Sequence, residues 1–266
     1  MTMPSTLKTM LPDGLRRHLG RLRWRLRHLY STRNYEALYE AHARRHPPTL
    51  SIGGGDYESM GLTMLGVLLM EGLKPDVTLV DFGCGTGRLA VHAIPWFKTG
   101  GRYIGFDISK TMLAHARTLV GEKIPSPLCS VEFLHQTTPN FPLPDKSVDM
   151  VCAFSVFTHM EHEDNYRYLR GVRRIIKDDG RFIYSCLPMD LAGSREIFLH
   201  QASLDAVGRW AEVRNVTTSR ELMDAIARMA GWEPIRWYPG DQPNIQLPYS
   251  SEIKWLGQSI CVLAPA

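Results

Sequence analysis

Three glycines stand at alternate positions in the loop Gly83–Gly87, directly after the apolar run Val77–Asp81. Glycines let a backbone approach a ligand closely because no Cβ intervenes. A dinucleotide loop requires G-x-G-x-x-G, but Arg88 stands where its third glycine belongs, and the chain contains no G-x-x-x-x-G-K-[ST] phosphate loop. Asp107 follows twenty residues after Gly87, at the end of the next apolar run, where a carboxylate can accept both hydroxyls of a ribose. The glycine spacing therefore argues against a pyrophosphate-binding loop.

Strands and helices alternate around this loop. Near-continuous apolar runs predict strands that helices cover on both faces, at Val77–Asp81, Arg102–Asp107, Ser130–Gln136, Val148–Phe154 and Arg181–Leu187. Helices are expected near Gly87–Phe97, Lys110–Val120 and Asp164–Lys177. This alternation predicts a doubly wound α/β domain with a parallel sheet. In the tail we expect a helix around Ser219–Ala230, then an antiparallel edge hairpin with a short connection, from "EPIRWYP" and "SICVLAP".

The stretch Asp81-Phe-Gly-Cys-Gly-Thr-Gly87 resembles the first motif of the class I S-adenosylmethionine-dependent methyltransferases, an acid followed by G-x-G-x-G. "YIGFDIS", "FPLPDKSVDMVCAFSVFTHM" and "YLRGVRRIIKDDGRFIYSC" resemble later motifs of that family in the same order. "IGGGDYESMG" is similar to the approach segment of a bacterial subgroup of the small-molecule and glycan type. The resemblance covers residues 50–190. It implies the Rossmann-like methyltransferase fold, a mostly parallel seven-stranded sheet with an antiparallel C-terminal edge hairpin.

The resemblance implies S-adenosylmethionine as cofactor and S-adenosylhomocysteine as product. The residues expected to bind the cofactor lie on the glycine loop and after the next strands: Asp81, Gly83, Cys84, Gly85, Gly87, Asp107, Ile108, Met112, Gln136, Thr137, Phe154 and Ser155. Many relatives have an acid near the adenine amine after the third strand. Gln136 and Thr137 stand there in this chain, and either an amide or a hydroxyl can bond the base.

By the family layout, the loop after the fourth strand faces the transferred methyl group. His159 is the candidate catalytic base for a hydroxyl acceptor, because an imidazole titrates near neutral pH. The same histidine could instead cap or pack at the loop–helix junction. Tyr57 and His162 are candidates for acceptor contacts, and further acceptor contacts are expected from residues 53–60, 187–194 and 238–255. The acidic cluster around His162 matches no ligand spacing, so we expect no metal site.

Positive charge is concentrated at the N-terminus. Residues 1–46 hold ten Lys and Arg against three acids, whereas the rest of the chain has a net charge of −3. Leucines at spacings of four and three predict an amphipathic helix over residues 13–30, and "NYEALYEAHARRH" predicts a second helix. We divide the chain into a basic helical extension, 1–48, and a methyltransferase domain, 49–266. The leucine stripe can pack on the domain, contact an anionic membrane surface, form a dimer seam, act as a nucleic-acid arm or belong to a transit peptide.

Five scattered cysteines without a C-x-x-C pair favour a reducing, cytoplasmic location, with the extension available for contact at the inner membrane surface. No apolar run reaches the length of a membrane span.

We expect methyl transfer to a small molecule, glycan or glycolipid, at a hydroxyl oxygen. Two alternatives remain: an RNA methyltransferase that uses the basic arm, and a cofactor-binding assembly or regulatory protein without turnover. The acidic balance of the body argues against nucleic acid as the acceptor.

Overall fold

The computed structural model describes residues 35–51, 56–209 and 213–266. Within them, apolar runs form a parallel core whose strands are β1 (Thr78–Phe82), β2 (Arg102–Asp107), β3 (Ser130–His135), β4 (Val148–Ala153) and β5 (Ile176–Pro188). These strands lie in the order β3-β2-β1-β4-β5. Val80 at the centre of β1 pairs with Ile104 on one side and Val151 on the other. The doubly wound parallel sheet predicted from the sequence is confirmed.

Two C-terminal strands complete the sheet at its edge. β10 (Ser259–Pro265) runs antiparallel to both β5 and β7 (Trp232–Tyr238), and the order continues β5-β10-β7. The antiparallel pair is therefore confirmed, but its connection is long. Residues 239–258 contain a small hairpin of their own, in which β8 (Ile245–Gln246) pairs with β9 (Ile253–Lys254). Outside this connection, the short strand β6 (Thr217–Thr218) pairs with the end of β5.

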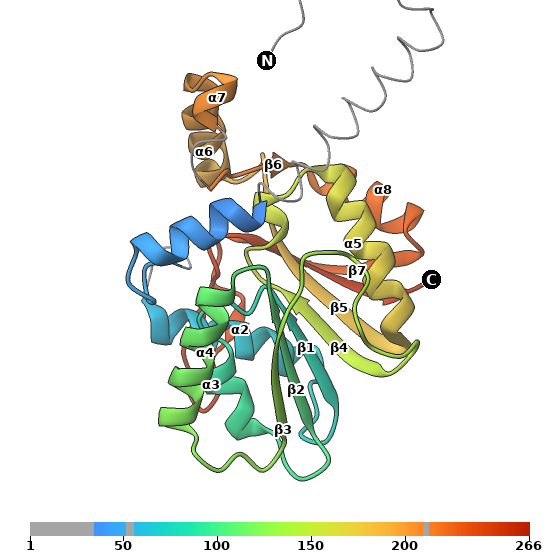
Figure 1. The fold of residues 1–266 in the computed structure, drawn as a ribbon. Coiled ribbons are helices and arrows are strands. Elements are labelled where there is room, and N and C mark those ends of the chain that lie inside the picture. The colour runs from blue at the N-terminus through green and yellow to red at the C-terminus, as the bar shows by residue number, and fades with distance from the viewer. Residues whose placement is uncertain (1–34, 52–55, 210–212) are drawn as a thin grey trace, which may run out of the picture.

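Helices cover both faces of the sheet (Figure 1). α2 (Tyr57–Met70), α3 (Ala90–Ala93) and α4 (Lys110–Lys123) share one hydrophobic cluster with Leu79 and Tyr103. α5 (His162–Ile175) and α8 (Arg220–Met229) share a second cluster with Val80 and Ile104. Successive strand residues thus enter opposite layers, as the period of a strand requires. α6 (Ala192–Ser203) and α7 (Ala206–Arg209) project beyond the end of the sheet (Figure 1).

Two predicted helices have different bounds in the structure. The helix expected at Gly87–Phe97 is short, with α3 giving way to a 3-10 turn, η2 (Ile94–Trp96), that contains Pro95. Proline lacks the N–H that a continuing α-helix needs. α5 ends at Ile175, because Ile176 already pairs with Val148 as the first residue of β5.

Residues 35–45 are helical, which confirms the helix predicted through "NYEALYEAHARRH". In Figure 1 this helix, drawn in blue, lies across the upper end of the sheet. The leucine stripe predicted over residues 13–30 lies outside the described residues. None of the helices in the described part of the chain has the length and apolar character needed to cross a membrane.

Candidate functional site

The glycine loop Gly83–Gly87 follows β1 and has a backbone that only glycine adopts without strain. Its three glycines have φ angles of 78°, 55° and 90°, in the left-handed region that other residues avoid. A Cβ on Gly83 would lie 2.3 Å from Cγ2 of Val156, and one on Gly87 would lie 3.3 Å from Cα of Ala116. Gly83 therefore allows the loop after β4 to approach, and Gly87 allows α4 to approach.

Asp107 ends β2 and holds the glycine loop from the opposite side. Its Oδ2 accepts the N–H of Gly85 at 2.9 Å, and its Oδ1 accepts the N–H of Ser109 at 2.8 Å. Burial raises the pKa of this carboxyl to about 6, although the two N–H groups act to lower it. Each carboxylate oxygen has more than one lone pair. Asp107 can therefore still accept two hydroxyl groups of a ligand.

A cavity of about 740 Å³ lies at the carboxyl ends of the parallel strands, where doubly wound sheets bind their ligands. Most of the residues predicted for the site line it: Asp81, Gly83, Cys84, Gly85, Asp107, Ile108, Met112, Gln136, Thr137, Phe154, Ser155 and His159. Three of the predicted residues lie outside the lining. Gly87 packs on α4, Tyr57 lines a smaller cavity where its hydroxyl is 3.3 Å from the Thr86 carbonyl, and His162 is the first residue of α5.

The segments expected to add acceptor contacts contribute little to this cavity. Residues 53–55 lie outside the described residues, and nothing from the described residues 56–60, 187–194 or 238–255 lines it. No group of three or more His, Cys, Asp or Glu side chains in the described part of the chain is arranged to hold a metal ion.

The Gln136 amide follows β3 and has one atom free for a ligand. Its Nε2 donates to the carbonyls of Thr138 and Asn140 at 2.6 and 3.0 Å. This network assigns the two amide atoms. Oε1 is consequently the atom that can accept a hydrogen bond from an exocyclic amine.

His159 lies at the end of the 3-10 turn η3 (Phe157–His159) and has a defined tautomer. Its Nδ1 is 2.8 Å from the carbonyl oxygen of Arg214, so Nδ1 carries the hydrogen and Nε2 of the neutral ring keeps its lone pair. Burial lowers the pKa of His159, although this hydrogen bond acts to raise it. The imidazole is therefore neutral near pH 7 and able to accept a proton at Nε2.

Ser155, between β4 and η3, has a strained backbone. Its φ is 57°, unusual for a residue with a side chain, and such strain typically costs about 1–3 kcal/mol and gathers at functional sites. Its N–H donates to Oγ of Ser185 at 2.7 Å, and its Oγ donates to Oε1 of Gln258 at 3.2 Å. These two bonds fix the loop that carries His159.

The helix of residues 35–45 forms one wall of the cavity, which sequence reasoning missed. Tyr35, Glu36, Tyr39 and His42 all line it. The ring of Tyr39 meets that of His159 edge-on, with centroids 5.9 Å apart, and burial raises the pKa of Tyr39 well above its usual value. The helix was predicted, but nothing in its local pattern indicated where it packs.

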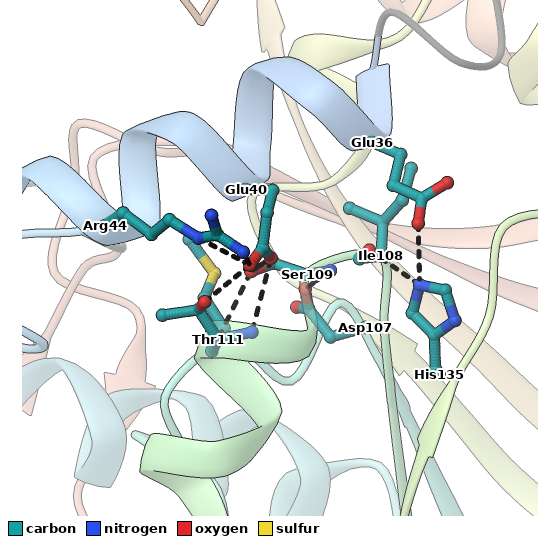
Figure 2. A network of polar contacts seen from close by, with 9 residues as sticks. Glu36, Glu40, Arg44, Asp107, Ile108, Ser109, Thr111 and His135 are labelled. Atoms are coloured by element: carbon teal, nitrogen blue, oxygen red, sulfur yellow. Dashed lines mark hydrogen bonds and ion pairs between the residues drawn. The ribbon is translucent and has the colours of Figure 1, made fainter.

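Figure 2 shows how Glu40 attaches this helix to the start of α4. Its carboxylate accepts the hydroxyl of Ser109 at 2.7 Å, the hydroxyl of Thr111 at 2.6 Å and the Thr111 N–H at 3.2 Å. Arg44 adds an ion pair at 3.0 Å. Burial acts to raise the pKa of Glu40, but these hydrogen bonds lower it to about 2. Ser109 is the N-cap of α4, and Glu40 supports this cap by accepting hydrogen bonds from Ser109 and Thr111.

A second contact joins the same helix to β3. Nε2 of His135 lies 3.3 Å from the Glu36 carboxylate and 3.0 Å from the Ile108 carbonyl (Figure 2). Both neighbours are acceptors, so this nitrogen carries a hydrogen.

Comparisons with known proteins agree with this geometry. Residues 80–184 match the model of the methyltransferase domain family. The uncharacterized methyltransferase YcgJ of Bacillus subtilis is 30% identical over 105 residues, which cover 40% of this chain and 38% of that protein. The O-methyltransferase resE of Aspergillus sclerotiorum is 24% identical over 161 residues, which cover 60% of this chain and 56% of that protein. The chain therefore spans less than two thirds of the length of these relatives.

Among solved structures, the magnesium protoporphyrin IX methyltransferase (ChlM) of Synechocystis with bound S-adenosylhomocysteine superposes with a TM-score of 0.58. The two are 17% identical, and the match covers 80% of this chain and 90% of the other. At this identity the likeness shows the fold.

Proposed function

Because this chain belongs to the class I S-adenosylmethionine-dependent methyltransferases through the domain at residues 80–184, we propose that it methylates a hydroxyl oxygen of a small molecule or glycan. The observation that carries this proposal is the cavity in which the glycine loop, Asp107 and His159 meet. One side of that cavity suits a nucleoside cofactor, and the other presents a neutral imidazole.

The residues of the cavity fit the cofactor. The Asp107 carboxylate is available to the two ribose hydroxyls, and Oε1 of Gln136 is available to the adenine amine. Gly83, Cys84 and Gly85 line the cavity, so the backbone of the glycine loop lies beside the ligand. Leu89, Met112 and Phe154 supply apolar wall to the same cavity.

S-adenosylmethionine would supply a methyl group bonded to a positively charged sulfur. The acceptor would bond to the methyl carbon as the S–CH3 bond breaks, which leaves S-adenosylhomocysteine. The residues of this chain align the two reactants, and such positioning can supply much of the rate. A hydroxyl acceptor must also lose its proton. Nε2 of His159 accepts that proton, giving a cation that the Arg214 carbonyl stabilises through Nδ1–H.

The acceptor is inferred to be polar and small enough to enter the cavity beside the cofactor. Beyond His159 the lining is mixed, with aromatic rings from Tyr35 and Tyr168, the amide of Asn215 and the ion pair of Arg167 with Asp164. Aromatic faces and fixed hydrogen-bonding groups suit a sugar or a phenol. The likeness to the O-methyltransferase resE supports an oxygen acceptor.

The test is methyl transfer from labelled S-adenosylmethionine to a panel of sugars, phenols, hydroxylated lipids and RNA, with the product bond identified by mass spectrometry. We expect a methyl ether on a sugar or a phenol. His159→Ala should lower kcat by about 100-fold or more, with little change in the KM for S-adenosylmethionine. The matched control is His200→Ala, because His200 is an exposed histidine on α6.

Near wild-type kcat in His159→Ala would remove the base assignment. A methylated amine or RNA as the product would contradict the hydroxyl proposal. S-adenosylmethionine binding without transfer to any acceptor would favour a non-catalytic role.

A further inference from the structure

Arg88, the residue after the glycine loop, brings a buried positive charge to the cavity. The residue is 7% exposed and lines the cavity. Its Nε is buried without a hydrogen-bond partner, and within residues 35–51, 56–209 and 213–266 no hydrogen bond or ion pair reaches the guanidinium. A guanidinium offers five N–H donors and stays charged, and arginine is almost never fully buried unless it is paired. The Arg88 guanidinium therefore has no anionic partner among the described residues.

The polar groups near Arg88 are engaged elsewhere. The Asp81 carboxylate accepts the hydroxyl of Tyr103 at 2.5 Å and lies beyond ion-pair distance of Arg88. The hydroxyl of Tyr57 is bonded within the glycine loop. Burial lowers the pKa of Arg88, while Tyr57 and Asp81 only partly offset that effect. The side chain is poorly solvated and its charge is unmatched by a close partner.

The order of the strands indicates which part of the cofactor comes near this charge. Gln136 follows β3, Asp107 ends β2, and Arg88 follows β1, and these strands are neighbours in that order. With adenine at Gln136 and ribose at Asp107, as proposed above, the methionyl end of the cofactor extends to the loop after β1. That end carries the single anionic group of S-adenosylmethionine.

We propose that the Arg88 guanidinium binds the carboxylate of the methionyl part of the cofactor. This assignment rests on the proposed function. Two N–H groups of a planar guanidinium match the two oxygens of a carboxylate, and exclusion from water strengthens the contact. Arg88 then selects ligands that carry the whole methionyl group over adenine nucleosides that lack it.

The experiment compares two ligands by isothermal titration calorimetry on the full chain. S-adenosylhomocysteine carries the carboxylate, whereas 5′-methylthioadenosine keeps the adenosine and sulfur but has no amino-acid end. We expect Arg88→Met to weaken S-adenosylhomocysteine about 10- to 100-fold and 5′-methylthioadenosine less than about 2-fold. Arg88→Lys keeps the positive charge but loses the planar pair of N–H donors, so its affinity for S-adenosylhomocysteine should lie between those of the wild type and Arg88→Met.

Arg170→Met is the matched control, because Arg170 is an exposed arginine of α5 that does not line the cavity. It should leave the ratio of the two affinities unchanged. Thermal melting of each variant confirms that it is folded. An equal loss for both ligands in Arg88→Met, or an unchanged affinity for S-adenosylhomocysteine, would overturn the Arg88 assignment. Wild-type protein that binds neither ligand would instead overturn the proposed function.

Discussion

Glu40→Gln should loosen the helix of residues 35–45 while the sheet beneath it stays intact. The pKa of Glu40 falls from an ordinary 4.5 to about 2. Since each pKa unit corresponds to about 1.36 kcal/mol, this shift corresponds to roughly 3 kcal/mol of stability at neutral pH. Because 21% of the side chain is exposed, screening reduces the figure to about 1–2 kcal/mol. The folded pKa lies below the unfolded one, so this contribution is complete above about pH 4.5 and is lost as the pH falls toward 2.

Hydrogen exchange followed by mass spectrometry measures this effect directly. The loss of about 1–2 kcal/mol corresponds to exchange about 5- to 30-fold faster in residues 35–45, equal at pH 6 and pH 8 after correction for the intrinsic rate. Peptides from β1 and β2 should be unchanged. Arg44→Gln is the control, because Arg44 is 71% exposed and a surface ion pair contributes little. Unchanged protection of the helix, or an equal loss throughout the sheet, would refute the role given to Glu40.

Three further results are expected. Gly83→Ala should destabilise the fold by about 2–4 kcal/mol in denaturant unfolding, because a Cβ would meet Val156 at 2.3 Å in addition to the cost of a positive φ. Gly72→Ala has a φ of 88° and open space around the Cβ, so it should cost only about 1 kcal/mol, and equal losses would refute the steric argument. The pH profile of kcat should fall on the acid side with an apparent pKa below 6.5, because burial lowers the pKa of His159; an acid limb above pH 7 would contradict this. S-adenosylhomocysteine should bind more tightly as the pH rises from 5 to 7, since the ribose hydroxyls donate to the ionised form of Asp107, whose pKa is about 6; an affinity independent of pH in that range would contradict this.

The parallel sheet could be predicted because its strands are buried on both faces and therefore read as apolar runs. Arg102–Asp107 has the predicted bounds, and the other parallel strands begin or end within one residue of prediction except β5. β5 begins five residues early because Ile176 pairs with Val148 while the following residues Lys177–Gly180 are polar or glycine. Local apolarity carries no information about such a pairing.

The cofactor-facing ends of β1 and β2 could also be predicted from the sequence, because a glycine loop followed at a fixed spacing by Asp107 indicates a ligand-binding site. The cavity wall formed by the helix of residues 35–45 could not be predicted in this way. Its position depends on tertiary contacts to Ser109 and Thr111, about 70 residues away along the chain. In the sequence, Arg88 is notable only because it stands where a dinucleotide loop has its third glycine. Its proposed role comes from its burial without a hydrogen-bond partner, which only the structure shows.

The central claim is that this cavity binds S-adenosylmethionine through Asp107, and calorimetry with S-adenosylhomocysteine tests it most directly. The wild-type chain should bind one equivalent. Asp107→Ala should weaken binding by about 100-fold or more, because two hydrogen bonds to a charged acceptor are lost, and Asp107→Asn, which keeps the shape, should weaken it less. No binding by folded wild-type protein, or equal affinity in wild type and Asp107→Ala, would contradict the account.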